Sequence, residues 1–224
     1  MTATIALCMI VKDEQHVIER CLASVRPVID SWCIIDTGST DETMHVIQRE
    51  LGDLPGQLIQ RPWVNFGHNR TELLQHANGM ADYLLLLDAD MELVIDDAFH
   101  KNLTDDGFLL RYLGRLDYAQ LLMVRDGLDW HYVGATHEYI TTDQQHTKRE
   151  LPTLKIRHHA DGSSRAIKFD RDIELLTAEL QQHPNDARTT FYLAQSLRDA
   201  GSTEESLGLY QRRAGMGGWA EGNC

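Results

Sequence analysis

The chain has 224 residues, of which 42% are hydrophobic and 25% are charged, and its formal net charge at pH 7 is -13. This length accommodates one α/β domain of about 150 residues with a small appendage. The negative charge excludes nucleic acid as a partner, because no basic surface is available to displace counterions from phosphates. A phosphate-bearing ligand would therefore need a few placed cations or a bound metal ion.

No two of the four cysteines form a Cys-x-x-Cys pair, and three of them lie in apolar stretches. They are typical of small buried side chains in a reducing compartment. The first apolar run, residues 5–11, is too short for a signal peptide, and no run approaches the length of a membrane span. We therefore predict a cytoplasmic protein with no membrane span.

The first ninety residues alternate between predicted strands and predicted helices. Continuous apolar runs are typical of strands that are buried on both faces of a parallel sheet. The predicted strands are residues 5–11, 32–36, 57–60 and 83–87. The predicted helices between them are 14–25, a helix capped by Thr40 that runs to Leu51, and 67–80. This order predicts a doubly wound α/β unit that binds its ligand at the carboxyl ends of the strands.

The pattern changes after Asp90. Short strand-like pieces separated by turn residues predict a mixed or antiparallel extension of the sheet, at 107–113, 118–124, 130–134, 138–142 and 151–158. The last part is helical, with predicted helices at 170–183, 187–200 and 203–214. We therefore expect a catalytic or binding domain over residues 1–168 and a helical tail over residues 169–224.

Asp88 and Asp90 directly follow the fourth predicted strand. Two carboxylates at the exit of a buried strand are costly unless something neutralises them. A hard divalent cation would do so and would leave positions open for phosphate oxygens. A solvated strand end that starts a turn is the alternative, and the short Asp-x-Asp pattern by itself leaves both readings open.

Two further polar residues occupy comparable positions. Asp36 ends the second strand, where its carboxylate could accept hydrogen bonds from a nucleobase or ribose, and Gly38 permits the tight turn that follows. Arg70 lies near the start of a predicted helix, where the helix dipole disfavours a cation. In a strongly acidic protein this position suggests an anion contact, with a surface salt bridge as the alternative.

Together these segments resemble the family 2 glycosyltransferases of the GT-A fold, over roughly residues 4–165. The matching segments are Met9–Glu14, Asp36–Asp41, Asn69–Arg70 and Asp88–Asp90. The resemblance implies an α/β fold with a mixed, mostly parallel sheet flanked by helices. It also implies a hexosyltransferase that moves a sugar from a UDP-linked donor with inversion, using Mn²⁺ or Mg²⁺. Lys12 and Thr37 depart from the family pattern and leave the identity of the nucleotide open.

The resemblance also implies roles for individual residues. It implies Val11 and Glu14 near the base, Asp36 on the uridine, Arg70 near the nucleotide, and Asp88 and Asp90 at the ribose and metal. His158 follows a predicted strand where the family often supplies a further metal ligand, and strand alternation favours it over His159. A hydrogen-bonded structural histidine is the alternative. Arg165 or Lys168, on a glycine- and serine-rich loop, could balance the charge of the leaving diphosphate.

The segment from Trp130 to Glu138 resembles the acceptor site of the family. An inverting transfer needs a base that removes the proton of the acceptor hydroxyl. Glu138 is the first candidate for this base and His137 is the second. An exposed hairpin with ordinary polar residues is the alternative.

The tail resembles a tetratricopeptide repeat. The residues that carry this resemblance are Leu193, Ala194, Leu197, Gly201, Ser206 and Tyr210. About one and a half repeats are present, and fewer than three seldom stand alone, which is consistent with a truncated array. By analogy with family members that join such repeats to this domain, the acceptor would be a protein, a peptide or a glycan.

Two competing functions stay open on the sequence. A nucleotidyltransferase also uses an α/β sheet and paired aspartates, but it would carry a glycine- and arginine- or lysine-rich loop after the first strand, which Lys12–Glu14 is not. The second competitor is a non-catalytic tetratricopeptide-type module whose nucleotide-sugar domain is degenerate. The presence of Asp88, Asp90 and Glu138 argues against it.

Overall fold

The computed structural model describes residues 2–114, 118–163 and 168–217, which form two compact units. The first unit comprises Met1–Val64, Asn69–His131 and Ile140–Ser163. The second comprises Asn65–His68, Tyr132–Tyr139 and Ser164–Cys224. The two units therefore interleave along the sequence, and each is described by itself.

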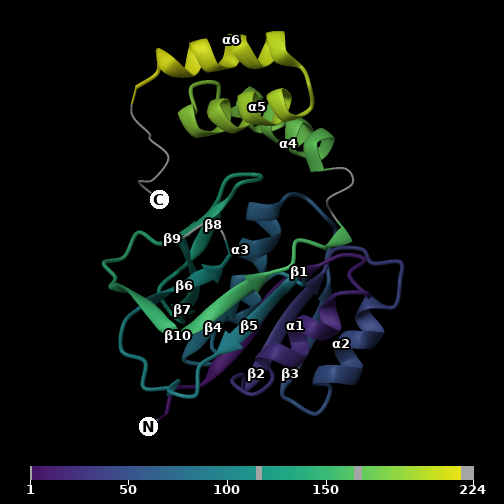
Figure 1. The fold of residues 1–224 in the computed structure, drawn as a ribbon, viewed down its shortest axis with the longest axis vertical. Helices are drawn as coiled ribbons and strands as arrows, with labels where there is room; N and C mark the ends of the chain where they lie inside the picture. Colours follow the sequence, from purple (N-terminus) through teal and green to yellow (C-terminus); the bar gives the residue numbers. More distant parts are fainter. Residues whose placement is uncertain (1, 115–117, 164–167, 218–224) are drawn as a thin grey trace. The chain divides into compact units, whose positions relative to one another are not determined.

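The first unit is built on an eight-stranded sheet with the order β3-β2-β1-β4-β7-β6-β10-β5 (Figure 1). Its strands are β1 (Ile5–Val11), β2 (Ser31–Asp36), β3 (Gly56–Gln60), β4 (Tyr83–Leu86), β5 (Met91–Ile95), β6 (Gly107–Leu113), β7 (Ala119–Arg125) and β10 (Lys148–His158). The four strands β3, β2, β1 and β4 are parallel, β6 pairs in parallel with β10, and β7 and β5 run antiparallel to their neighbours. This mixed, mostly parallel sheet with flanking helices confirms the predicted GT-A fold class.

The central strand β1 is buried along its whole length, as its continuous apolar sequence predicts. Successive side chains of a strand point to opposite faces, so both faces of the sheet are covered here. The helices of this unit are α1 (Ile18–Val25), α2 (Thr43–Leu51) and most of α3 (Phe66–Ala77). Leu22 of α1 and Ile47 of α2 are fully buried in the same apolar cluster as alternate residues of β1.

The sequence missed one strand, and one predicted helix cap is wrong. Strand β5, which pairs antiparallel with β10, was not predicted, because it follows the Asp-x-Asp turn at once and has only five residues. Thr40 does not cap α2: its backbone N–H donates to Asp13 Oδ1 at 2.7 Å, and α2 begins at Thr43. Asp41 instead accepts the Thr43 N–H at 3.0 Å, because its short carboxylate can bond two residues along the chain.

The second unit contains three helices, α4 (Lys168–Gln182), α5 (Ala187–Asp199) and α6 (Thr203–Ala214). Leu176, Leu193 and Leu197 form its small apolar core. Ser206 of α6 donates its hydroxyl to a backbone carbonyl of α5 at 2.7 Å, which ties the two helices together. The predicted helical tail is thus present, while its assignment as a tetratricopeptide repeat stays a prediction.

The strands β8 (His131–Val133) and β9 (Tyr139–Thr141) pair with each other as a separate two-stranded sheet. Among the residues that the structure describes, no helix has both the length and the apolar character needed to cross a membrane.

The close approach of β2 and β3 generates a test of the fold. A Cβ added at Gly56 would lie 2.3 Å from the indole ring of Trp32, which is 5% exposed and donates its Nε1–H to the Leu51 carbonyl at 3.0 Å. We expect Gly56→Ala to lower the free energy of unfolding by about 1–3 kcal/mol through overpacking. Urea denaturation followed by tryptophan fluorescence would measure this.

The matched control is Gly208→Ala in α6. A Cβ at Gly208 meets nothing within 4 Å, so this change should raise stability by about 0.5–1 kcal/mol through helix propensity alone. Equal unfolding midpoints for Gly56→Ala and the wild type would contradict the packing that we describe for Trp32.

Candidate active site

The carboxyl ends of β1, β2 and β4 lie at one edge of the sheet, because these strands are parallel and adjacent. Val11, the last residue of β1, is in register with Asp36, the last residue of β2. The loop after β1 is bonded to the loop after β2: Glu14 N–H donates to Thr43 Oγ1 at 2.8 Å, and Asp13, which has a φ of 53°, accepts from the Thr40 N–H. The candidate site is therefore built on two mutually supported loops.

Asp36 is fully buried at this edge. Its Oδ1 accepts the N–H groups of Gly38 and Ser39, both at 3.0 Å, so the turn after β2 closes on the carboxylate. Its Oδ2 is buried and has no hydrogen-bond partner among the described residues. A buried acceptor without a partner is costly, so a donor group from a ligand would be bound favourably here.

Val11 is also buried, with 3% of its surface exposed. Its carbonyl oxygen accepts both the N–H and the hydroxyl of Thr37, at 2.9 and 3.1 Å. These bonds fix the backbone at the point where β1 ends. The predicted contact of Val11 with a base stays a prediction.

Arg70 and Asp88 form an ion pair at this edge. Arg70 Nη2 donates to Asp88 Oδ1 at 2.6 Å, and the arginine side chain is only 12% exposed. The sequence left open whether Arg70 contacts an anion or forms a salt bridge. In the structure it lies against one of the two predicted metal-site aspartates, where its charge could serve a bound diphosphate as well.

Asp90 lies beside His158, the last residue of β10. The His158 Nε2 and Asp90 Oδ2 atoms are 3.1 Å apart, whereas His159 pairs with Glu92 at 2.7 Å. The geometry thus brings the side chain of His158, and not that of His159, to the carboxylate of Asp90, as strand alternation predicts. Burial by itself would raise the pKa of Asp90, but the hydrogen bond and charge of His158 hold that pKa below its ordinary value.

The donor atoms at Asp90 and His158 fit a shared divalent cation. Two ligands separated by 3.1 Å can both bind one ion at distances of about 2.1 Å. No group of three or more His, Cys, Asp or Glu side chains within the described ranges is arranged to hold a metal ion. Mg²⁺ commonly binds one or two carboxylates and takes its other ligands from phosphates and water, so the set is adequate for a cation that arrives with a diphosphate.

Glu14 adds a further negative charge to this edge. Burial raises its pKa, two hydrogen bonds from Ser163 oppose that rise, and the charges of Asp90 and Asp88 add to it. The carboxylates therefore repel one another in the absence of a bound cation. A divalent ion would relieve this repulsion, which is the second observation that fits a metal at this site.

The predicted base, Glu138, and its alternative, His137, belong to the second unit. They lie in the Tyr132–Tyr139 segment, where His137 has a φ of 52°. A non-glycine residue in this region is strained, and such strain clusters at functional sites. The roles of Glu138 and His137 stay predictions.

Helices α4 and α5 bind this segment closely. Glu179 Oε2 accepts the Ala135 N–H at 3.2 Å, and the buried Asp172 accepts the Thr136 hydroxyl at 3.2 Å. The ring of Tyr192 stacks on the ring of His137, with centroids 4.2 Å apart. Sequence reasoning missed these contacts, because the residues that make them lie among ordinary helical positions.

The other two predicted diphosphate-binding residues cannot be compared with the geometry. Arg165 lies outside the described residues. Lys168 is the first residue of α4, and its side chain is outside the described part as well. Both assignments stay predictions.

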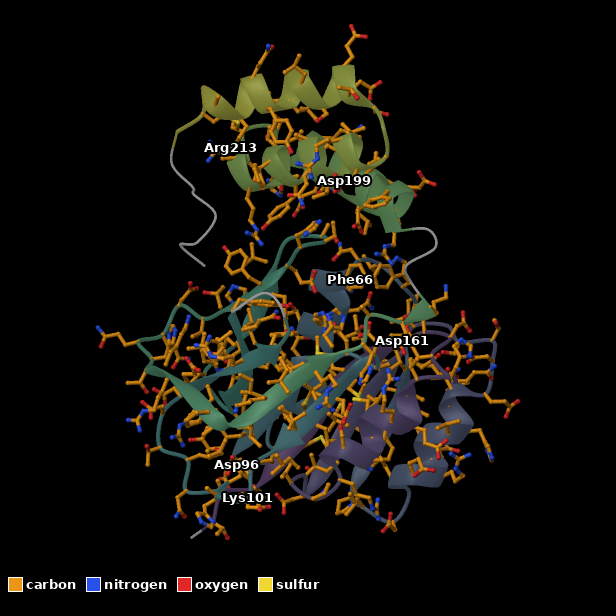
Figure 2. The ribbon with its side chains drawn as sticks, in the orientation of Figure 1. Phe66, Asp96, Lys101, Asp161, Asp199 and Arg213 are labelled. Atoms are coloured by element: carbon orange, nitrogen blue, oxygen red, sulfur yellow. The ribbon has the colours of Figure 1, made fainter. Side chains whose placement is uncertain are left out.

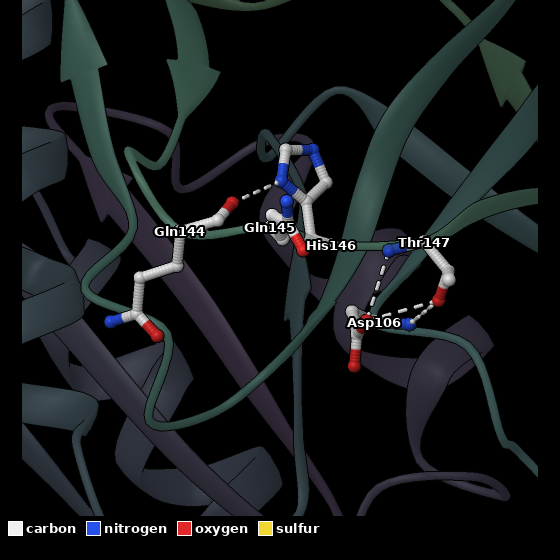
Figure 3. A pocket seen from close by; sticks show the side chains of 5 residues that line it. All are labelled: Asp106, Gln144, Gln145, His146 and Thr147. Atoms are coloured by element: carbon white, nitrogen blue, oxygen red, sulfur yellow. Dashed lines mark hydrogen bonds between the residues drawn. The ribbon is translucent and has the colours of Figure 1, made fainter.

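An open hollow lies elsewhere on the first unit (Figure 3). It is lined by Asp106, Gln144, Gln145, His146 and Thr147. Asp106 accepts the N–H and the hydroxyl of Thr147 through Oδ2 and the Arg125 guanidinium through Oδ1. Both of its oxygens are thus bonded within the fold, and the hollow has the character of a structural turn.

Comparison with known proteins finds a family match in the first half of the chain. Residues 6–101 match the family model described as Glycosyl transferase family 2. The match covers the strands β1 to β5 and therefore contains Asp36, Arg70, Asp88 and Asp90. It supports a family 2 glycosyltransferase.

Two relatives match nearly the whole chain. A TPR repeat-containing protein of Synechococcus elongatus is 30% identical over 94% of this chain and 55% of its own length. The glycosyltransferase SunS of Bacillus subtilis, derived from prophage SPbeta, is 22% identical over 92% of this chain and 52% of its own length. The chain thus spans about half the length of the curated relatives it matches.

Among solved structures, the glucosyl-3-phosphoglycerate synthase of Mycobacterium tuberculosis, in complex with Mn²⁺, uridine diphosphate and glucosyl-3-phosphoglycerate, is similar in part. It is 21% identical over 40% of this chain and 34% of that chain, with a TM-score of 0.33.

The contacts of the Tyr132–Tyr139 segment with α4 generate a test. We expect Glu179→Ala to speed hydrogen exchange of the Ala135 amide about tenfold or more, because that N–H loses its carboxylate acceptor. Exchange would be followed by mass spectrometry or NMR. The control is Glu174→Ala, an exposed residue of the same helix. Equal exchange rates at Ala135 in both variants would show that α4 does not hold this segment.

Proposed function

We propose that the chain is a metal-dependent glycosyltransferase that moves a sugar from a UDP-linked donor to an acceptor nucleophile with inversion. The observation that carries this proposal is the pairing of Asp88 with Arg70 and of Asp90 with His158 at the edge where the parallel strands end. Arg70, Asp88 and Asp90 lie within the segment that matches the glycosyltransferase family, and His158 lies outside it but is in register with Met91 through the pairing of β10 with β5. They supply oxygen and nitrogen donors together with one cationic side chain.

The proposed division of roles follows from the chemistry of each group. Asp90 and His158 would hold a Mn²⁺ or Mg²⁺ ion, which when bound would stabilise the negative charge of the departing diphosphate. Arg70 would turn from Asp88 toward a phosphate oxygen, and Asp88 would then be available to the ribose. Asp36 would accept a hydrogen bond from the uracil ring through Oδ2, which has no partner in the described part of the chain. Glu14 would contribute to the same base pocket.

On the acceptor side, we propose that Glu138 removes the proton of the attacking hydroxyl, with His137 as the alternative base. Arg165 or Lys168 would neutralise the leaving group. The helices α4 to α6 are proposed to be a tetratricopeptide-like element, and the acceptor a protein, peptide or glycan. The similarity to the TPR repeat-containing protein of Synechococcus elongatus supports the first of these assignments.

Two other functions make different predictions. A nucleotidyltransferase would bind a nucleoside triphosphate through a basic loop after β1, but the loop here, with Asp13 and Glu14, is acidic. A non-catalytic module would bind a protein partner through its helices and would need neither nucleotide nor metal. Nucleotide binding therefore separates all three candidates.

The first prediction concerns the donor. In isothermal titration calorimetry, the chain should bind UDP more tightly than other nucleoside diphosphates when Mn²⁺ is present. Binding should weaken at least about 100-fold with excess chelator or in Asp90→Ala, because the diphosphate charge then loses its counter-ion. The control is Asp96→Ala, an acidic residue directly after β5 whose N–H donates to the Thr153 carbonyl and whose carboxylate accepts the Ala98 N–H.

A folded wild type that binds no nucleoside diphosphate would refute the glycosyltransferase proposal and favour the binding module. Tight binding of a triphosphate without metal would instead favour a nucleotidyltransferase. Metal-dependent binding of a different diphosphate would keep the proposal and change only the donor.

The second prediction concerns the base. Glu138→Gln should bind UDP and Mn²⁺ as tightly as the wild type but should transfer sugar about 100- to 10,000-fold more slowly, because the amide cannot accept a proton. His137→Gln should cost less if Glu138 is the base. The assay is release of UDP from the UDP-sugar over a panel of acceptors. A transfer rate in Glu138→Gln within twofold of the wild type would remove Glu138 from the mechanism.

A further inference from the structure

The segment from His158, the last residue of β10, to Ser163 is held by side-chain contacts on both sides of a single strained residue. On one side, His159 Nε2 lies 2.7 Å from Glu92 Oε2, and the His159 N–H donates to the Asp90 carbonyl at 3.1 Å. On the other side, Arg20 of α1 donates to both oxygens of Asp161, at 3.0 and 2.7 Å. Asp161 is labelled in Figure 2.

The strained residue is Ala160, which has a φ of 61°. Residues other than glycine avoid this conformation, because it brings Cβ close to a carbonyl oxygen. Such a conformation persists only where the surrounding contacts hold it. The two neighbours of Ala160 both have side-chain partners: His159 contacts Glu92, and Asp161 forms an ion pair with Arg20. These contacts lie next to the strained residue that they must hold.

The strained turn brings both of its ends to the candidate donor site. Before the turn, His158 Nε2 lies 3.1 Å from Asp90 Oδ2. After the turn, Ser163 donates its N–H and its hydroxyl to Glu14 at 3.2 and 3.0 Å. Gly162 lies between the two acids: a Cβ built there would be 3.3 Å from a Glu14 oxygen and 3.4 Å from an Asp90 oxygen.

We propose that Arg20, Asp161, His159 and Glu92, here called the clasp, are positioning residues for the metal–nucleotide site. The clasp acts through the strained turn, which it holds so that His158 faces Asp90 and Ser163 faces Glu14. None of the clasp residues needs to touch the nucleotide. This inference rests on the proposed function, because it takes the Asp90–His158 pair as part of the donor site.

The physical reason is pre-organisation. A segment that is already ordered does not lose further conformational freedom when the ligand binds, and that saving appears as affinity. An arginine that donates from two nitrogens to one carboxylate fixes both distance and orientation, which a lysine at the same place would not. Arg20 is also suited to this position because its charge interacts favourably with the neighbouring Glu92 and Asp90.

A purely structural salt bridge is the alternative. The Arg20 and Asp161 side chains are 33% and 45% exposed, and exposed ion pairs contribute little to global stability. A positioning role and a purely structural role for this ion pair therefore predict different measured effects of a variant. A positioning pair affects nucleotide binding with little change in the melting temperature, whereas a stabilising pair affects the melting temperature alone.

The test measures binding of UDP in the presence of Mn²⁺ by calorimetry, using the full chain. We expect Arg20→Met and Asp161→Asn each to weaken binding about three- to tenfold, the range that a partly exposed bidentate ion pair can supply. The exchanged pair Arg20→Asp with Asp161→Arg should return the affinity to within about twofold of the wild type, since it restores opposite charges at the same two positions.

The matched control is Arg49→Met on α2. Arg49 also bonds two acids, Glu50 at 2.7 Å and Glu19 at 2.9 Å, but neither belongs to the clasp. Its loss should leave UDP binding unchanged. Hydrogen exchange supplies a second readout that needs no ligand: the His159 and Ser163 amides should exchange several-fold faster in Arg20→Met and Asp161→Asn but not in Arg49→Met.

Three results would overturn the inference. The first is unchanged UDP affinity in both Arg20→Met and Asp161→Asn. The second is a loss in Arg20→Met alone, which would mean that Arg20 contacts the ligand directly. The third is an unchanged exchange rate of the His159 amide in Asp161→Asn. This variant is nearly isosteric with the wild type, so its exchange rate can be measured even if Arg20→Met is too unstable for calorimetry. Failure of the proposed function is distinct, because the wild type itself would then bind no UDP.

Discussion

Negative charge gathered at one edge of the sheet is the constraint on which the first unit depends. Asp36 ends a buried parallel strand, and Glu14, Asp88 and Asp90 follow two others, in a chain whose net charge is already -13. Isolated carboxylates are expensive to bury, so each must be paired, hydrogen-bonded or neutralised by a ligand. The residues around these carboxylates pair with them or donate hydrogen bonds to them.

The bonding partners differ between the four acids. Asp88 receives a guanidinium, Asp90 a histidine, Glu14 the N–H and hydroxyl of a serine, and Asp36 two backbone N–H groups. Within the described residues, one oxygen of Asp36 has no hydrogen-bond partner. A structure that needed only stability would place apolar side chains here, so the remaining repulsion is better explained by a cationic or hydrogen-bonding ligand.

The sequence was sufficient to predict the parallel half of the fold. Buried parallel strands such as β1 have no alternation, and continuous apolar runs mark them directly, so the acids that follow them could be assigned to one edge. His158 could be preferred to His159 because a strand has a fixed period of two. These inferences depend only on local periodicity.

Contacts between distant positions could not be predicted in this way. The pairing of β5 with β10 joins residues about sixty positions apart, and Arg20 meets Asp161 across an even longer stretch of sequence. Arg20 lies on a helix where an exposed arginine is ordinary, so nothing local distinguishes it. Thr40 is a common type of cap residue, but its N–H donates to Asp13 and α2 begins only at Thr43. This bond also joins distant positions.

The interleaving of the two units has a consequence for how the chain folds during synthesis. During synthesis the Tyr132–Tyr139 segment leaves the ribosome before α4 and α5 exist, so the Ala135 N–H and the Thr136 hydroxyl must be satisfied by water until those helices emerge. The eight-stranded sheet needs no residue after Ser163, and all its strands can pair earlier. The segment that carries Glu138 would therefore acquire its native conformation after the sheet. In a nascent chain whose sheet is complete, the proposed base would not yet be held in position.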